Sequence, residues 1–379
     1  MSECVPGAKV PETQDYDPYA MRNYSALALP RDIPTWEIAL KLTFYAIALL
    51  IDIIGNSIVA LIILINKKMR TTTNLLILNL AISDIMVGAF CMWVHAGNSV
   101  TKEWPFGNYV CKVNIFIQVV AVTSSILTLT AISVERFFAI IYPLKRHRAP
   151  YFTAVVITVN WIVSVAMASP LLVVRRRFEL YWADRHQVWC DEDWPKVFTD
   201  NDCIQTKSPG RITYYTIVVV VMYFIPIVVM LCTYSIILIK LVFRKRPGAT
   251  ISASNQAQLK YRKKVIRMLV AVLAAFIICW TPQQTFILWD IYRDRTTKTK
   301  GYVLKIQYAA VYIAYCNSAL NPILYGGFNE NFRKGFKDAF RCLLLRKNNS
   351  VVPFNSNRTG VVRTVHVSGN TTPMGTSNM

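Results

Sequence analysis

Charged residues are scarce in this chain of 379 residues, making up 17% of it, while hydrophobic residues make up 54%. Long stretches carry no charge at all, which a soluble domain rarely shows. Proline and glycine are missing from one of the longest apolar runs, Tyr109–Ile141. This run therefore predicts one continuous helix, long enough to cross a membrane.

Residues that carry common enzyme chemistry are also few. The chain has only four histidines. It has neither an HExxH zinc motif nor the serine elbow motif of hydrolases. The sequence therefore argues against a membrane enzyme, and no catalytic residue is expected. No cofactor is expected either, apart from a structural Na⁺ considered below.

Acidic residues are nearly absent from the segments that we predict to face the cytoplasm. Almost all of the net charge of +21 falls there, and the outer segments are close to neutral. This distribution follows the positive-inside rule, so we expect an extracellular N-terminus and a cytoplasmic C-terminus. It leaves no basic face for nucleic acid. The predicted location is the plasma membrane, as a multi-pass protein.

Seven apolar segments are long enough to span the membrane, at 36–66, 71–98, 109–141, 151–173, 211–243, 262–291 and 303–326. They form a predicted bundle over residues 36–326, with an inner connection at Arg244–Lys264. Residues 1–35 are predicted to be a disordered outer tail with a glycosylation sequon at Asn23. No internal repeat of the kind found in transporters is visible.

Phenylalanine recurs every four residues in 329–342, with Arg and Lys between. This pattern predicts a short amphipathic eighth helix on the inner leaflet, and Cys342 at its end is a candidate for palmitoylation or a free thiol. Residues 343–379 are rich in Ser, Thr and Asn, and we expect a disordered cytoplasmic tail.

Four polar or reactive residues share one strip of the third predicted span: Cys111, Gln118, Ser125 and Arg136. At 100° per residue they stay within about 40° of each other. The strip is about 37 Å long, so its two ends should reach opposite water layers. Gln118 and Ser125 must lie on a face that other helices cover, because lipid cannot satisfy their hydrogen bonds.

Asp84 lies in the middle of the second predicted span, and a buried carboxylate there is costly. Neutral polar side chains fall at a similar depth, among them Asn56, Ser125, Asn317, Ser318 and Asn321. Such a group could bind Na⁺ or a proton, or could be a water-filled packing cluster. The sequence leaves both interpretations open.

Seven motifs occur in order along these spans: Gly55-Asn56, Asn79-Leu80-Ala81 with Ser83-Asp84, Glu135-Arg136-Phe137, Trp161, Phe276 to Pro282, Asn321 to Tyr325, and the Phe-Arg pair at Phe332-Arg333. Together they resemble the motifs of the rhodopsin-like G-protein-coupled receptors. The resemblance covers nearly the whole membrane portion. It implies an all-α membrane protein, a bundle of seven helices that activates a heterotrimeric G protein.

The resemblance also implies residue roles. Arg136 would contact the G protein beside Glu135, and Leu144 would insert into its α subunit. The remaining activation residues would be Ile126, Pro226, Tyr234, Phe276, Trp280 and Tyr325. A sodium site would comprise Asp84, Ser125, Asn317 and Asn321. Arrestin and a receptor kinase are further expected partners.

Two departures from the family pattern affect the cytoplasmic side. Phe137 stands where Tyr is usual and Glu135 where Asp is usual. The start of the sixth span, at Tyr261–Lys264, is wholly basic and offers no acid to Arg136. Glu135 is therefore the residue expected to hold Arg136.

Gln118 stands where amine receptors of the family carry Asp, which disfavours an amine ligand. Tyr315 stands where opsins carry their retinal lysine, which excludes an opsin. Glutamine amides suit a peptide backbone or a C-terminal carboxamide, although they can also bond each other inside the bundle. The ligand-binding candidates are Gln118, Gln283, Gln284, His95, Asn98, Tyr215, Ile287, Asp290, Gln307, Val311 and Glu192.

Acidic residues near the predicted mouth, Asp290 and Asp191 to Asp193, lead to the hypothesis that one of them pairs a ligand arginine. The resemblance is greatest to receptors for amidated neuropeptides, including the neuropeptide FF, RFamide, neuropeptide Y and orexin types. We therefore expect an RFamide- or RYamide-like peptide ligand. A small-molecule or lipid receptor, and more distantly an ion or proton transporter, are the alternatives.

The second outer loop carries two cysteines, and the resemblance implies that one of them pairs with Cys111. The context of Cys190, followed by Asp-Glu-Asp-Trp-Pro, is similar to that loop in neuropeptide FF receptors, so Cys190 is favoured over Cys203. Two short stretches, Val173–Leu180 and Gln187–Cys190, flank a turn and predict a β-hairpin over the pocket.

Overall fold

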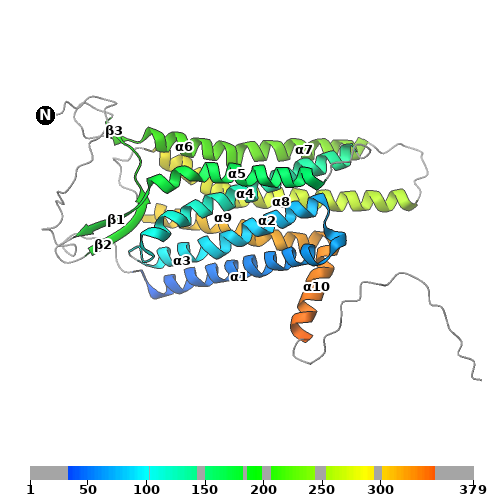
Figure 1. Cartoon of the computed structure of the whole chain (residues 1–379), viewed down its shortest axis with the longest axis horizontal. Coiled ribbons are helices and arrows are strands. Elements are labelled where there is room, and N and C mark those ends of the chain that lie inside the picture. Colours follow the sequence, from blue (N-terminus) through cyan, green and yellow to red (C-terminus); the bar gives the residue numbers. More distant parts are fainter. Residues whose placement is uncertain are drawn as a thin grey trace, which may run out of the picture. The chain divides into compact units, whose positions relative to one another are not determined.

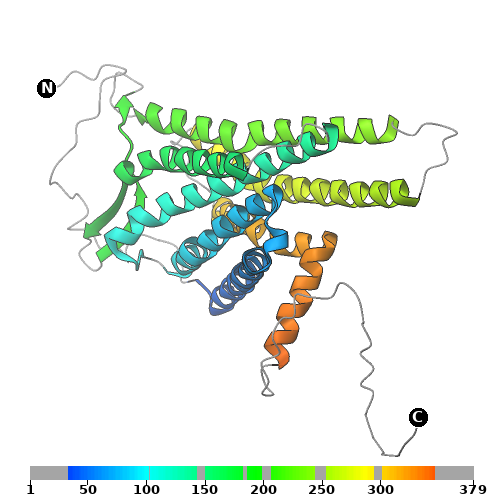
Figure 2. The same cartoon turned by 45° about the vertical axis from the view of Figure 1, so that its right-hand side comes forward.

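The computed structural model describes residues 33–101, 103–142, 150–181, 186–198, 206–243, 253–293 and 301–345. Figures 1 and 2 show its helices running side by side, with a β-hairpin at one end of the bundle. We call that end the hairpin end, and the end that carries Arg136 the opposite end. The predictions for Asn23, Leu144 and the alternative Cys203 fall outside the described residues.

Within the described residues, the helices form seven passes, as the sequence predicts. The first is α1 (Thr35–Ile65), followed by a 3₁₀ turn at Lys67–Met69. The second joins α2 (Thr72–Val87) to α3 (Trp93–Val100) through a π-helical turn at Gly88–Met92. The third and fourth are α4 (Gly107–Ile141) and α5 (Pro150–Val174).

The fifth pass joins α6 (Pro209–Val219) to α7 (Ile225–Phe243) through a π-helical turn at Val220–Phe224, which ends two residues before Pro226. The last two are α8 (Ala253–Tyr292) and α9 (Gly301–Phe328), which contain Pro282 and Pro322. By length and composition, six of these described stretches could each cross a membrane, and α9 is not among the six.

One predicted boundary is wrong. We expected an inner connection up to Lys264, but α8 already begins at Ala253. The apolar run marks only the part of a helix that lipid covers. The preceding Gln, Leu, Lys and Arg residues are good helix formers, and water can surround them.

The hairpin comprises β1 (Arg175–Tyr181) and β2 (His186–Glu192), which pair antiparallel with Arg175 opposite Glu192. A second short pair is formed by β3 (Val197–Phe198) and β4 (Thr206–Lys207). A disulfide joins Cys190 in β2 to Cys111 in α4, the pairing favoured above. The hairpin is therefore covalently attached to the third pass.

The eighth helix, α10, spans Glu330–Leu345, slightly longer than predicted. Its Phe332 is fully buried and packs against Tyr325 of α9, with ring centroids 5.8 Å apart. Residues from Phe340 onward form a separate unit, and the side chain of Cys342 is outside the described part of the structure.

Small and polar side chains allow the passes to pack closely in the bundle. A Cβ built on Gly55 of α1 would lie 2.7 Å from Pro322 of α9, so these helices meet where only glycine fits. Trp161 of α5 donates to Asn79 of α2 (2.9 Å), and Asn79 donates to Thr128 of α4 (2.8 Å). Two of the quoted motifs thus meet in one hydrogen-bonded chain across three passes.

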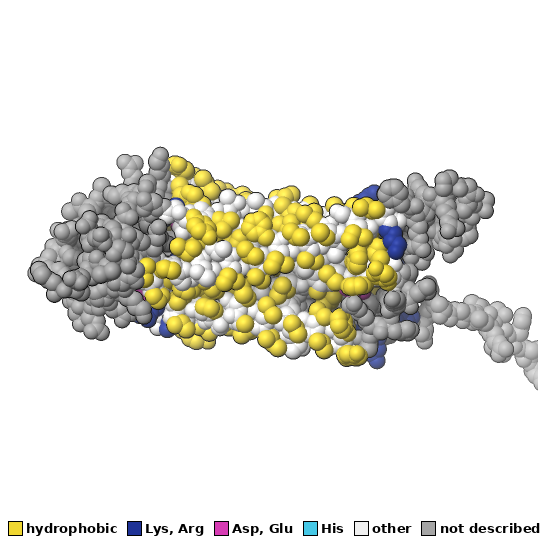
Figure 3. Space-filling model, turned by 90° about the horizontal axis from the view of Figure 1, so that it is seen from above, with side chains coloured by type: hydrophobic (Ala, Val, Ile, Leu, Met, Phe, Trp, Pro, Cys, Tyr) yellow, Lys and Arg dark blue, Asp and Glu magenta, His cyan; other side chains and the backbone are white. Residues whose placement is uncertain are grey.

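Hydrophobic side chains cover the middle of the face seen in Figure 3, and Lys and Arg lie near its ends. Leu40, Leu50, Ile54 and Ile65 of α1 are about half exposed or more. An extended apolar surface that is exposed in this way is favourable only in lipid. This is the surface of a membrane protein.

Candidate functional site

A cavity of about 350 Å³ lies inside the hairpin end of the bundle. Side chains from α4, α6, α8, α9 and both hairpin strands line it. Nine of the predicted ligand-binding residues are among them: Gln118, Glu192, Tyr215, Gln283, Gln284, Ile287, Asp290, Gln307 and Val311. Residues far apart in the sequence therefore converge on one pocket, as the bundle arrangement requires.

Two predicted residues lie elsewhere. The His95 ring contacts the Tyr45 hydroxyl (Nδ1 to O, 2.9 Å) and packs edge-on against Tyr315. Asn98 is exposed near the end of α3. Neither belongs to the cavity lining. Their depth along the helix was compatible with the pocket, but the direction in which they point was not visible from the sequence.

The deep part of the cavity, which we call the floor, comprises Gln118, Trp280, Gln283, Gln284 and Tyr315. Four of its buried polar atoms have no hydrogen-bond partner among the described residues: Trp280 Nε1, Tyr315 Oη and the two amide oxygens Gln283 Oε1 and Gln284 Oε1. Unpaired buried polar groups are uncommon and costly in folded proteins. The floor therefore has hydrogen-bonding groups for a partner that the described residues do not supply.

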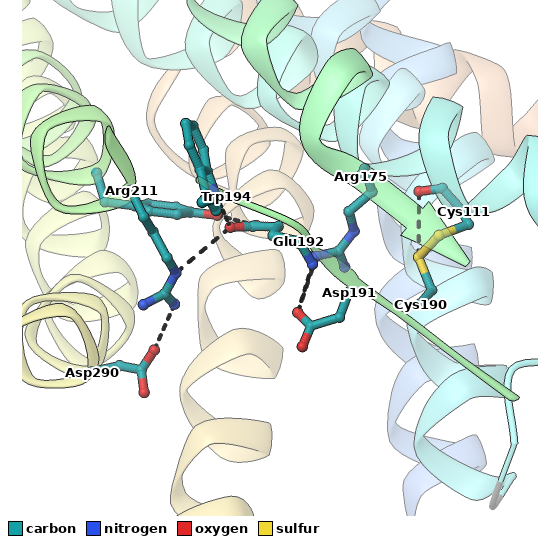
Figure 4. A network of polar contacts seen from close by, with 9 residues as sticks. Cys111, Arg175, Cys190, Asp191, Glu192, Trp194, Arg211 and Asp290 are labelled. Atoms are coloured by element: carbon teal, nitrogen blue, oxygen red, sulfur yellow. Dashed lines mark hydrogen bonds and ion pairs between the residues drawn. A yellow bond between two sulfur atoms is a disulfide. The ribbon is translucent and has the colours of Figure 1, made fainter. Parts of the chain in front are cut away.

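The shallow part of the cavity, which we call the mouth, comprises Arg175, Asp191, Glu192, Arg211 and Asp290. Figure 4 shows Arg211 between Glu192 and Asp290, with Arg175 beside Asp191. The two arginines were missed in the sequence analysis. A signal was available, because a nearly neutral outer surface with several acids must also hold basic partners.

Both inward acids of the mouth are already paired. Arg211 Nη2 lies 2.7 Å from Asp290 Oδ2, and Arg293 Nε lies 3.0 Å from the other carboxylate oxygen of Asp290. Glu192 accepts a hydrogen bond from Trp194 Nε1 (2.7 Å) and another from the Tyr215 hydroxyl. The hypothesis of an acid free to bind a ligand arginine must therefore include these partners.

Glu192 also contacts two arginines, at 3.4 Å from Arg175 Nη1 and 3.7 Å from Arg211 Nε. Its side chain is only 9% exposed, compared with 21% for Asp290. The low exposure strengthens these contacts, because little water screens them. Glu192 fixes the end of β2 to the fifth pass.

The middle of the bundle holds the buried carboxylate of Asp84. Its Oδ1 accepts from the Ser125 hydroxyl (3.0 Å) and its Oδ2 from Asn321 Nδ2 (2.7 Å). Asn317 is also buried, at 4% exposure. Asp84 forms no ion pair with a basic side chain in the part of the chain that the structure describes. Three of the four predicted sodium-site residues are thus in direct contact.

Asp52 is a second fully buried acid, in α1. Its Oδ1 accepts from Asn56 Nδ2 (2.7 Å), and its Oδ2 has no partner among the described residues. A Cβ on Gly88 would lie 2.4 Å from that oxygen, so the π-helical turn packs its backbone directly against the carboxyl group.

At the opposite end, Arg136 Nε lies 3.1 Å from Glu135 Oε2, and the Thr73 hydroxyl donates to the same oxygen (2.7 Å). Glu135 therefore holds Arg136 in this state, as the sequence indicates. Four predicted activation residues are buried in the apolar core between the cavity and Arg136: Ile126, Tyr234, Phe276 and Tyr325. Trp280 packs against this core, and Pro226 is also buried.

The resulting arrangement connects a polar cavity at one end to a paired arginine at the other. Trp280 belongs to both the cavity lining and the edge of the core. Its ring centroid lies 6.4 Å from that of Phe276. A displacement of Trp280 would thus be transmitted by direct packing.

Comparison with known proteins gives a match to the family model described as "7 transmembrane receptor (rhodopsin family)" over residues 55–325. The chain is 33% identical to the neuropeptide FF receptor 2 of Mus musculus over 86% of its own length and 78% of the relative's. It is 34% identical to the QRFP-like peptide receptor of Branchiostoma floridae, over 80% and 78% respectively. It is also 31% identical to the substance-P receptor of Homo sapiens, over 82% and 72%.

Proposed function

The chain belongs to the rhodopsin family of seven-transmembrane receptors, and we propose that it is activated by a C-terminally amidated neuropeptide of the RFamide or RYamide kind. It is a receptor that signals through a heterotrimeric G protein, not an enzyme. Relatives named for peptide ligands, including the neuropeptide FF and QRFP-like receptors, support a peptide ligand.

The unpaired amide oxygens of Gln283 and Gln284 are the observation that favours an amidated ligand. A carboxamide donates two N–H groups and is uncharged, so it can satisfy these acceptors. A free C-terminal carboxylate has no N–H to offer these two oxygens and would place negative charge against them. Leaving a buried polar group unpaired costs about 1–3 kcal/mol, which is enough to discriminate between the two ligand forms.

The charged mouth favours a peptide over the alternative of a lipid or small apolar ligand. Arg175, Glu192, Arg211 and Asp290 surround the route to the floor. A peptide can bring backbone and side-chain hydrogen bonds to these groups, whereas an acyl chain would desolvate them without replacement.

In this proposal the hairpin end is extracellular and the opposite end is cytoplasmic. Ligand bound at the floor pushes on Trp280 and favours a state in which the inner part of α8 moves outward. Glu135 then releases Arg136 to the G protein. Arrestin and a receptor kinase would act on the cytoplasmic side. Leu144 would insert into the G-protein α subunit there, and Cys342 would be palmitoylated.

A Na⁺ ion fits the neighbourhood of Asp84. The carboxylate is fully buried and is hydrogen-bonded by the neutral groups of Ser125 and Asn321, and Asn317 is also buried. Oxygen ligands around one negative charge suit a hard monovalent cation. These four residues would hold the ion, and the ion would be the positively charged partner of the Asp84 carboxylate.

The experiment compares one peptide ending in Arg-Phe-amide with its free-acid form, in cells that report G-protein activation. We expect the amide to be at least about tenfold more potent. Gln283→Leu should reduce this preference, while Gln307→Leu, which makes the same change in an exposed residue of the lining, should retain it. Equal potency of the two forms in the wild type, or activation only by non-peptide ligands, would refute the proposal.

A further inference from the structure

Arg211 lies between the two inward acids of the mouth and is the only described side chain whose ion pairs include both (Figure 4). It belongs to α6, Asp290 belongs to α8, and Glu192 ends β2. Its contact with Asp290 is short, at 2.7 Å, and its contact with Glu192 is longer, at 3.7 Å. One guanidinium thus connects the fifth pass, the sixth pass and the hairpin.

Glu192 and Asp290 differ in how many partners other than Arg211 they have. Glu192 keeps three other partners, namely Trp194, Tyr215 and Arg175. Arg211 is the partner of Asp290 Oδ2, and both residues line the cavity, whereas Arg293, the partner of Oδ1, is not among the lining residues. Asp290 is therefore the acid at which a cation from outside could take the place of Arg211.

We infer that Arg211 acts as an internal competitor for the guanidinium of the ligand, occupying the place on Asp290 that a ligand arginine takes. This inference rests on the proposed peptide ligand and specifies how the receptor binds the arginine side chain of that ligand. On binding, the ligand arginine pairs with Asp290 Oδ2, and Arg211 is left with Glu192. Arg293 stays on the other oxygen of Asp290.

An exchange of one guanidinium for another has a thermodynamic consequence. The number of ion pairs is the same before and after, so the ligand gains only the difference between two similar contacts. The wild-type receptor should thus discriminate weakly between an arginine ligand and a neutral analogue. Without Arg211, the same ligand arginine would gain the full contact with Asp290.

The exchange also changes which parts of the molecule are tied together. Before it, α8 is connected to α6 through Arg211 and Asp290. After it, α8 is connected to the ligand. The ligand therefore comes into direct contact with the outer end of the sixth pass, the pass whose inner part must move.

The opposite interpretation is that Arg211 and Asp290 form a permanent staple that the ligand never reaches. The two cases predict opposite results when Arg211 is neutralised. A competitor that is removed makes an arginine ligand more potent, whereas a staple that is removed weakens every ligand alike.

The test uses the full receptor in cell membranes, with a peptide ending in Arg-Phe-amide and the same peptide with citrulline, a neutral isostere, in place of arginine. Arg211→Gln should raise the potency of the arginine peptide about twofold to fivefold, the range of one partly exposed ion pair. The potency of the citrulline peptide should not rise. Asp290→Asn, alone or with Arg211→Gln, should remove the difference between the two peptides.

Arg176→Gln is the matched control, because Arg176 pairs with Asp193 on the exposed side of the hairpin and is not part of the lining. It should leave both potencies unchanged. Equal weakening of both peptides by Arg211→Gln, or a gain that survives in the double variant, would overturn the exchange.

A measurement without peptide separates this inference from the proposed function. In the purified, ligand-free receptor, Arg211→Gln and Asp290→Asn should each lower the melting temperature, and the double variant should lower it by less than the sum of the two single shifts. Additive shifts, with an intact response to the amidated peptide, would remove the exchange alone. If neither wild type nor Arg211→Gln responds to any arginine peptide, both the proposed ligand and the exchange fall.

Discussion

The two ends of the bundle handle charge in opposite ways. At the hairpin end, the acids of the mouth contact arginines: Asp290 touches two, and so does Glu192. At the opposite end, some basic side chains bond backbone carbonyls near helix C-termini instead of acids. Lys240 donates to the carbonyl of Ile141 (3.0 Å), and Arg70 donates to that of Leu64.

This difference defines what each end can bind. The mouth is electrically self-neutralised, so a charged ligand must exchange with a residue that is already paired. The opposite end keeps an excess of positive charge that helix C-termini stabilise but do not cancel. It therefore suits an acidic protein surface or anionic lipid headgroups. Two of its described cations, Arg136 and Lys264, pair with Glu135 and Glu330 respectively.

The largest effect should come from detaching the hairpin. Cys111→Ser removes the disulfide to Cys190, and loss of such a bond costs about 2–5 kcal/mol. We expect strongly reduced surface expression and loss of the peptide response, measured by surface labelling and G-protein activation. Cys232→Ser, which changes an exposed free cysteine of α7, is the control and should behave as wild type. A normal response of the Cys111 variant would show that the mouth assembles without its covalent attachment.

Arg136→Ala should separate the two ends most clearly. Because Arg136 lies far from the cavity lining, peptide binding should persist while agonist-driven nucleotide exchange is almost lost. Radioligand binding and nucleotide exchange on the same membranes measure both. Arg70→Ala, another basic residue at the opposite end, should retain most of the exchange. Full exchange by Arg136→Ala would contradict the assigned role.

A smaller effect is expected at Thr73, whose hydroxyl donates to the oxygen of Glu135 that contacts Arg136. Thr73→Val keeps the side-chain shape and removes one hydrogen bond to a charged group. The weaker hold on Glu135 should raise ligand-independent signalling by about threefold to tenfold. Thr153→Val is a useful control, since the Thr153 hydroxyl is buried and has no partner among the described residues. Unchanged basal signalling in the Thr73 variant would mean that Glu135 needs no support.

The smallest effect should come from the exposed pair of Lys264 and Glu330, 2.6 Å apart, which joins α8 to the start of α10. Glu330→Gln should raise basal signalling less than Thr73→Val does, because water screens an exposed pair. Lys264 holds the pKa of the Glu330 carboxyl below its usual value. The contribution of the pair is therefore present at neutral pH and is lost as the pH falls through that lowered pKa. A rise as large as that of Thr73→Val would mean that this pair contributes as much to the inactive state as the hydrogen bond between Thr73 and Glu135.

Much of the fold could be predicted from the sequence because membrane helices must be long, apolar and internally hydrogen-bonded. The predicted spans 36–66 and 109–141 differ from α1 and α4 by at most two residues at either end. The start of α8 could not be found in the same way, since the helix continues past the lipid into residues without an apolar pattern.

The candidate site was readable in part. Gln118, Gln283 and Gln284 stood out because polar side chains in apolar spans have few explanations. Arg175 and Arg211 did not, because an arginine at the end of a span is ordinary and its direction is unknown. His95 had the same depth as true lining residues, yet it turns toward Tyr45.

The sequence by itself determined that this chain crosses a membrane, how many times it does so, and that Arg136 and Gln118 lie at different depths of one helix. These follow from local composition, helix geometry and the cost of polar groups in lipid. Only the tertiary structure decided that Asp290 is already bound by Arg211 and Arg293, and that Glu135 shares its oxygen between Arg136 and Thr73. Such pairings depend on the rotation and distance of separate helices, which no single stretch of sequence contains.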